Sequence, residues 1–198
     1  MNSCKDGEYQ PQDCDLIFQL AEGTDFSKAI TDATAQQDEF KFDHVGMIVI
    51  EDGVPYVLEA SSKKGVSLVA FQDFTRKLHE GYVIKRVKFP LSCEQIIKEA
   101  KSHLGEPYDW SFLPNNGKMY CSELIYEAYR NEQGTPIFHA NPMNFLDKEG
   151  KFPQFWIDLF KNLKEEIPQG VMGTNPTDLS KEEILEEKFR CLPSATEE

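Results

Sequence analysis

The chain has 198 residues, of which 40% are hydrophobic and 28% charged, and its formal net charge is −13. This length and composition are those of one globular domain with a substantial hydrophobic core. The acidic charge repels phosphate backbones, which argues against nucleic acid as a partner, and no apolar stretch is long enough for a transmembrane helix.

Five cysteines are present: Cys4, Cys14, Cys93, Cys121 and Cys191. An odd count without regular spacing does not predict a disulfide framework, and the lack of a Cys-x-x-Cys motif argues against a structural zinc site. The first residues form no apolar run, so the chain as given has no export signal and is interpreted as soluble and cytoplasmic. A signal removed from a longer precursor would instead place it in the cell envelope.

The first half of the chain predicts an antiparallel sheet with one early helix. Thr24 or Asp25 is placed to cap that helix, and residues 33–39 are polar and predict a loop. Asp52-Gly53 lies between two strand-like runs and is a strong signal for a two-residue hairpin turn. Five segments have the composition of strands: 15–19, 44–50, 54–60, 66–71 and 82–88.

The second half of the chain predicts helices. Ser92 and Gln95 form a capping-box pattern, with Leu91 and Ile96 as its hydrophobic staple, and the helix that follows ends before Gly105. Further helices are expected from Cys121 to Arg130 or beyond, over 152–163, and after a second capping box of Ser180 and Glu183, with a frayed tail after Cys191. One α+β domain spanning 1–198 accounts for this order of elements.

Cys121 is the residue that points most directly to chemistry. Leu124, Ile125 and Ala128 follow it at helical spacing, which predicts that Cys121 lies in the first turn of a helix. The unpaired N–H groups and positive dipole end of a helix favour a thiolate, which is the nucleophile of cysteine hydrolases. The alternative from position alone is a small buried side chain on the same apolar face.

A cysteine hydrolase needs a histidine base within reach of the thiol, oriented by a third polar group. The chain has four histidines: His44, His79, His103 and His139. Three of them lie in polar stretches, in a loop or on the outer side of a helix, and are interpreted as ordinary surface residues. His44 differs because it begins a strongly apolar strand.

The hairpin turn gives His44 a partner. With a two-residue turn at Asp52-Gly53, the numbers of paired residues sum to 105, so Gly46 faces Glu59. His44 and Glu59 then project from one face of the sheet as diagonal neighbours. A glutamate there fixes the imidazole tautomer and makes it more basic, and Gly46 leaves room beside it. A register slip of one residue would place the two on opposite faces.

The order and spacing of several motifs resemble the permuted papain-like amidases, the YiiX- and YaeF-like branch of the NlpC-type cysteine amidase superfamily. The resemblance covers roughly residues 15–130 and, weakly, 175–179. It rests on these segments: Asp15-Leu-Ile-Phe18, His44-Val-Gly46, Leu58-Glu-Ala60, Gly65-Val66, Gly105-Glu-Pro-Tyr108-Asp-Trp110 and Tyr120-Cys-Ser-Glu-Leu124.

The resemblance implies a circularly permuted papain-like fold, in which an antiparallel sheet packs against helices that include the nucleophile helix. Matched residue by residue, it makes His44 the base, Glu59 its orienting partner and Cys121 the nucleophile. Tyr108 matches a tyrosine near the cleft and is expected to bind substrate or the oxyanion. Acyl transfer to water by these residues needs no metal and no organic cofactor.

Outside this set of residues, the resemblance carries further expectations. The core is expected over about 14–130, with 131–198 as additional helical elements. Residues 130–173 lie outside the clear resemblance and are the segment expected to shape the substrate pocket. Asp15 matches a recurrent structural residue. Cys14 departs from the pattern, because the family usually has glycine there, and a positive φ at this position would strain a cysteine.

The function that follows is hydrolysis of an amide or peptide bond through a thioester acyl-enzyme. The family resemblance suggests cell-wall peptides, and the acidic net charge favours a cationic group on the substrate. Alternatives are a lipid acyltransferase or hydrolase with the same permuted order, a non-catalytic binding module, and a metal site built from Cys121, His44 and Glu59. The oligomeric state is left open by the sequence.

Overall fold

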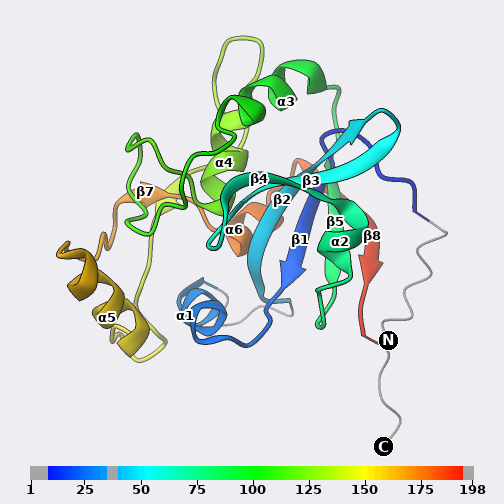
Figure 1. The fold of residues 1–198 in the computed structure, drawn as a ribbon. Coiled ribbons are helices and arrows are strands. Elements are labelled where there is room, and N and C mark those ends of the chain that lie inside the picture. Colours follow the sequence, from blue (N-terminus) through cyan, green and yellow to red (C-terminus); the bar gives the residue numbers. More distant parts are fainter. Residues whose placement is uncertain (1–8, 35–39, 194–198) are drawn as a thin grey trace, which may run out of the picture.

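Residues 9–34 and 40–193 are described by a computed structural model (Figure 1). Its centre is a six-stranded sheet with the strand order β4-β3-β2-β1-β5-β8, in which all neighbours are antiparallel. The strands are β1 (Leu16–Leu20), β2 (Phe42–Glu51), β3 (Val54–Ser61), β4 (Gly65–Ala70), β5 (Tyr82–Val87) and β8 (Leu185–Cys191). Two short strands, β6 (Asn141–Pro142) and β7 (Met172–Gly173), pair separately.

Helices cover both faces of the sheet unequally. The helices are α1 (Asp25–Thr34), α2 (Phe71–Thr75), α3 (Cys93–Ser102), α4 (Cys121–Ala128), α5 (Gln154–Leu163) and α6 (Pro176–Ser180). The larger core joins one face, through Met47 and Leu58, to Leu124 and Ile125 of α4. A smaller core on the other face joins alternate strand residues such as Ile48 to Phe74 of α2. In Figure 1, α3 and α4 lie above the strands, and α1 and α5 lie at the lower left.

The hairpin between β2 and β3 has the predicted register. Glu51 pairs with Val54 and Met47 pairs with Leu58, so a two-residue turn at Asp52-Gly53 is confirmed. Continued along both strands, this register keeps His44 and Glu59 on the same face of the sheet, as predicted.

The structure corrects several expected boundaries. The second capping box is wrong: Ser180 ends α6, and 185–191 form β8, which pairs with the outer edge of β5. An open strand edge offers unpaired backbone groups, and here that pairing prevails over the local helix signal. Asn175 caps α6 instead, accepting from the N–H of Asp178.

Other differences are smaller. Ser92 precedes α3 as expected, but its side chain makes no capping hydrogen bond. Phe71 begins α2 instead of ending β4, and α4 ends at Ala128, before Arg130. A loop was expected over 33–39, but Ala33 and Thr34 belong to the end of α1. Residues 35–39 lie outside the described residues. The tail beyond 193 also lies outside them.

The segment after α4 holds α5, which matches the helix expected over 152–163, together with α6, which was not predicted, and it also supplies β8 to the central sheet. Within the described residues, none of the helices combines the length and the apolar character that crossing a membrane requires.

Gly65 joins the sheet to the loop before α4. Its φ is +67°, and a Cβ placed there would lie 2.1 Å from the carbonyl oxygen of Glu106. The neighbouring backbone is hydrogen-bonded, because the Val66 N–H donates to Glu106 (2.9 Å) and the Gly105 N–H donates to Val66 (3.0 Å). Because Gly65 has no side chain, residues 105–107 lie directly against β4. This contact fixes the position of the backbone just before Tyr108.

We expect Gly65→Ala to destabilise the protein more than Gly117→Ala. Both glycines have a left-handed φ, and an alanine there costs about 1–2 kcal/mol. Only Gly65 adds a backbone clash, since nothing lies within 4 Å of a Cβ at Gly117. The extra overpacking should lower the free energy of unfolding in urea by about a further 1–3 kcal/mol. Equal losses in the two variants would contradict this account.

Candidate active site

Cys121 is the first residue of α4, as predicted, and its side chain is buried. The backbone N–H groups of a first helical turn have no intrahelical partner and point out of the helix end. Tyr120 precedes the helix in an extended conformation, and its N–H donates to the carboxyl group of Glu123 (3.3 Å). This contact fixes the direction from which the chain enters the helix at Cys121.

Glu123 is itself buried, and burial raises its pKa to about 8. Its carboxyl group therefore carries a proton for much of the neutral pH range, and it brings little negative charge to the end of α4.

A segment from the far end of the chain holds the same helix terminus. The Thr174 N–H donates to the Tyr120 hydroxyl (3.1 Å), and the Thr174 hydroxyl donates to that of Ser122 (3.0 Å). Ser122 is fully buried, so this contact is shielded from water. The residues on both sides of Cys121 are therefore fixed by side chains outside the helix. No sequence signal indicated this role for Thr174.

His44 and Glu59 meet as the hairpin register predicts. His44 Nε2 lies 2.5 Å from Glu59 Oε2, and their side chains are only 15% and 10% exposed. Gly46 makes this approach possible, because a Cβ there would lie 2.6 Å from a methyl carbon of Val57 and 3.5 Å from the Glu59 Cβ. The hydrogen bond occupies Nε2 and leaves Nδ1 for a second partner.

A β-bulge lies directly before His44. Gln19 of β1 pairs with His44, and the next residue, Leu20, pairs with Phe42, so Asp43 is the extra residue of β2. Bulges bend a strand and redirect its side chains, and they are common beside active sites. The alternation of strand residues alone could not predict this bulge.

His44 also contacts Cys121. Burial opposes protonation of the imidazole, but hydrogen bonds to Cys121 and Glu59, and the negative charge of both, raise the pKa of His44 well above its usual value near 6.5. The site therefore favours an imidazolium held between a carboxylate and the sulfur.

Tyr108 follows residues 105–107, the loop that packs against Gly65, and this loop holds it beside the His44–Cys121 pair. The Asp109 N–H donates to the Met119 carbonyl (3.0 Å), and the Met119 N–H donates to the Pro107 carbonyl (3.1 Å). Burial and the nearby charge of Cys121 raise the pKa of Tyr108 well above 10, so its hydroxyl keeps its proton. Among the described residues this hydroxyl has no hydrogen-bond partner, so it is a free donor.

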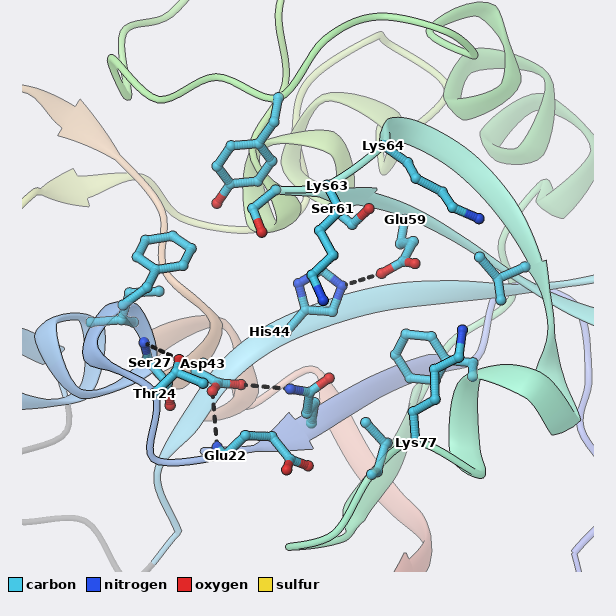
Figure 2. Close-up of a pocket in the computed structure, with 18 residues that line it drawn as sticks. Glu22, Thr24, Ser27, Asp43, His44, Glu59, Ser61, Lys63, Lys64 and Lys77 are labelled. Atoms are coloured by element: carbon cyan, nitrogen blue, oxygen red, sulfur yellow. Dashed lines mark hydrogen bonds and ion pairs between the residues drawn. The ribbon is translucent and has the colours of Figure 1, made fainter. Parts of the chain in front are cut away.

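Tyr108 lines two cavities. A cleft of about 370 Å³ is lined by His44, Glu59 and Tyr108, and Figure 2 shows the His44–Glu59 pair inside it. A smaller cavity of about 50 Å³ is lined by Tyr108 and Cys121, with mainly apolar neighbours such as Phe112. The candidate site therefore has an open polar side and a narrow apolar side.

The other three histidines lie apart from this cluster. His79 is exposed, His103 lies beside Glu99 and Glu106 on and after α3, and His139 is exposed and contacts Glu182. The positions of His79 and His139 agree with the interpretation of surface residues, whereas the His103 side chain is only 18% exposed.

Two residues before β1 have structural surroundings. Asp15 is fully buried and accepts from Arg86 Nε (2.5 Å) and Nη2 (2.9 Å). Cys14 has a φ of +63°, so this position does require the conformation that glycine adopts most easily. The Cys14 carbonyl accepts from the Tyr129 hydroxyl (3.0 Å), which helps to hold it there.

Comparison with known proteins places this arrangement in a family. Residues 10–187 match the profile of the permuted papain-like amidase enzymes of the YaeF/YiiX family. The chain belongs to this family. It is 34% identical over 167 residues to the uncharacterized protein YiiX of Escherichia coli K12, covering 81% of this chain and 77% of that protein.

The fold of this family is also found in a solved structure. A crystal structure described as metalloprotein yiiX from Escherichia coli O157:H7 superposes with a TM-score of 0.76 at 28% identity. The match covers 93% of this chain and all of that one. The mixed α+β architecture and the permuted papain-like fold expected from the sequence are therefore confirmed.

Proposed function

We propose that this member of the permuted papain-like amidase family hydrolyses an amide or peptide bond, with Cys121 as nucleophile, His44 as base and Glu59 as its orienting partner. The observation that carries the proposal is that His44 contacts both Cys121 and Glu59 in a buried site. Cysteine hydrolases require this sequence of contacts, from thiol to imidazole to an orienting acceptor.

The first half of the reaction forms a thioester. The Cys121 sulfur attacks the carbonyl carbon of the substrate, and the imidazolium of His44 gives its proton to the departing amine. Glu59 keeps Nε2 bonded throughout, so that Nδ1 stays directed at the sulfur and the leaving group. The amine leaves, and the acyl group remains on Cys121.

The second half releases the acid. Neutral His44 takes a proton from water, the hydroxide attacks the thioester carbonyl, and the Cys121 sulfur leaves as a thiolate beside the imidazolium. The acyl group departs as a carboxylic acid, and the starting protonation of the site is restored.

Two donors are available for the oxyanion of each tetrahedral intermediate. The Cys121 N–H lies at the open end of α4, and the Tyr108 hydroxyl is a protonated donor that lines both cavities. Fixed donors in a buried site stabilise developing negative charge far more than water does. We assign Tyr108 this role on the basis of its protonation and its position.

The family supports the proposed substrate class. Its name points to an amide, and the resemblance suggests peptides of the cell-wall type. A binding module on the same fold is the main competing function, and the experiments below separate the two.

The description of the Escherichia coli O157:H7 protein as a metalloprotein raises the question of a metal here. A zinc ion would bind donors at about 2.0–2.2 Å from itself. His44 Nε2 and Glu59 are already bonded to each other at 2.5 Å, which leaves no space for an ion between them. Within 9–34 and 40–193, no three His, Cys, Asp or Glu side chains group in a way that could hold a metal ion. These residues do not fit a metal, and no step is assigned to one.

We expect Cys121→Ala to abolish turnover of every amide or activated ester that the unaltered protein hydrolyses, because it removes the nucleophile. Cys93→Ala is the matched control. Cys93 also begins a helix, and a hydrogen bond with Cys14 lowers its pKa, but it has no histidine partner among the described residues. Release of product is measured for both variants, with circular dichroism to verify that they fold.

If Cys121→Ala retained the activity, the proposed nucleophile would be wrong. If the unaltered protein and Cys93→Ala both bind members of a substrate panel but release no product, the binding module is favoured.

Tyr108→Phe should lower kcat by about 10²–10³-fold while leaving KM within a few-fold, since a lost oxyanion donor acts in the transition state. Tyr126→Phe is a suitable control, because Tyr126 is a half-buried tyrosine of α4 that lines neither cavity. Steady-state kinetics on one substrate checks both variants. A Tyr108→Phe variant that changes only KM would assign Tyr108 to substrate binding instead.

A further inference from the structure

Three lysines line part of the cleft that holds the His44–Glu59 pair. Lys63 and Lys64 come from the turn between β3 and β4, and Lys77 follows α2. All three are exposed and line the cleft. Figure 2 shows Lys64 and Lys77 on the side of the pocket where Glu59 lies, with Lys63 drawn across His44. This clustering of positive charge is notable in a chain whose formal net charge is −13.

The ammonium groups of these lysines are available to a ligand. In the part of the chain that the structure describes, none of the three forms an ion pair, whereas other lysines do, such as Lys101 with Glu51 (2.6 Å). An exposed, unpaired ammonium group can bind an anion without first breaking an internal contact.

The carboxylates of the same cleft are already engaged. Glu59 bonds to His44, and Asp43 accepts from Gln19 Nε2 (3.2 Å) and from the N–H of Glu22 (3.1 Å). The Glu22 side chain accepts from the N–H of His79 (2.9 Å). These donors to Asp43 and Glu22 are neutral, so both carboxylates keep their charge, whereas Glu59 is paired with His44. Among the residues that line the cleft, the three lysines therefore outnumber the two carboxylates that have no cationic partner.

We propose that Lys63, Lys64 and Lys77 form an anion subsite that selects amide substrates bearing a carboxylate or similar anionic group near the scissile bond. This inference rests on the proposed function, since it names the class of substrate for that site. The acidic surface repels anions elsewhere, and the cleft is where three cations offset this repulsion. The local charges thus point to the opposite substrate charge from the one that the global composition favours.

The test compares two alkylating reagents that differ in charge. Iodoacetate is an anion and iodoacetamide is neutral, and in both cases the Cys121 sulfur forms a bond to the same carbon while iodide leaves. The rates at Cys121 are measured by mass spectrometry of the labelled peptide. Their ratio shows how strongly the site favours an anionic reagent over a neutral one. The intrinsic reactivity of the thiol cancels from this ratio.

The cleft variant is Lys63→Gln, Lys64→Gln and Lys77→Gln combined. The matched control is Lys98→Gln, Lys148→Gln and Lys161→Gln combined, three exposed lysines outside the cleft whose removal changes the net charge equally. Both are compared with the unaltered protein at low salt and at high salt.

A charge at about 4–8 Å in water changes the local concentration of an anion by roughly two- to sixfold. We therefore expect the cleft variant to lower the iodoacetate-to-iodoacetamide ratio by about tenfold or more at low salt, and the control by less than about twofold. The difference should largely vanish at about 1 M salt, where screening acts over about 3 Å.

Equal ratios in the cleft and control variants would overturn the anion subsite. The proposed function is judged separately by His44→Ala, which should slow iodoacetamide at Cys121 but not at Cys93. If His44→Ala slows iodoacetamide at Cys121 but the iodoacetate-to-iodoacetamide ratio is equal in the cleft and control variants, only the anion subsite is wrong. If His44→Ala has no effect on Cys121, the proposed function fails as well.

Discussion

The hydrogen bond between His44 and Glu59 is the contact on which the rest of the site depends. It joins β2 to β3, with 2.5 Å between His44 Nε2 and Glu59 Oε2, and it requires the register set by the turn at Asp52-Gly53. A slip of one residue would turn one partner to the other face of the sheet. Gly46 adds a second condition, because any side chain there would collide with Val57 beside Glu59. The geometry of the base is thus a consequence of backbone pairing.

The nucleophile is fixed by a different part of the fold. Cys121 is carried by α4, which packs on β2 and β3 through the larger core. The start of that helix is held by the Tyr120–Glu123 contact and by Thr174, more than fifty residues away in the sequence. Independent anchoring of the sheet and of the helix end brings the sulfur to the imidazole, which raises the pKa of His44. Rigid support of this kind is what a reactive pair needs to keep its orientation.

Local signals predicted much of this arrangement. The Asp-Gly turn fixes cross-strand partners by number, so the His44–Glu59 contact followed from counting, and helical spacing placed Cys121 at a helix start. Pairings between distant segments could not be predicted in this way. β8 joins the sheet because β5 has an open edge, although Ser180 and Glu183 carry a local helix signal. The bulge at Asp43, the role of Thr174 and the gathering of lysines around one cleft likewise depend on tertiary structure.

The central claim is that His44 is an imidazolium held between Cys121 and Glu59. Titration of its ring signals by NMR, in the unaltered protein and in Cys121→Ala, tests this most directly. The account predicts a pKa for His44 well above 6.5 in the unaltered protein, because the sulfur and the carboxylate both stabilise the charged ring, and a clearly lower value once the sulfur is removed. A pKa near 6.5 that is unchanged in Cys121→Ala would contradict it.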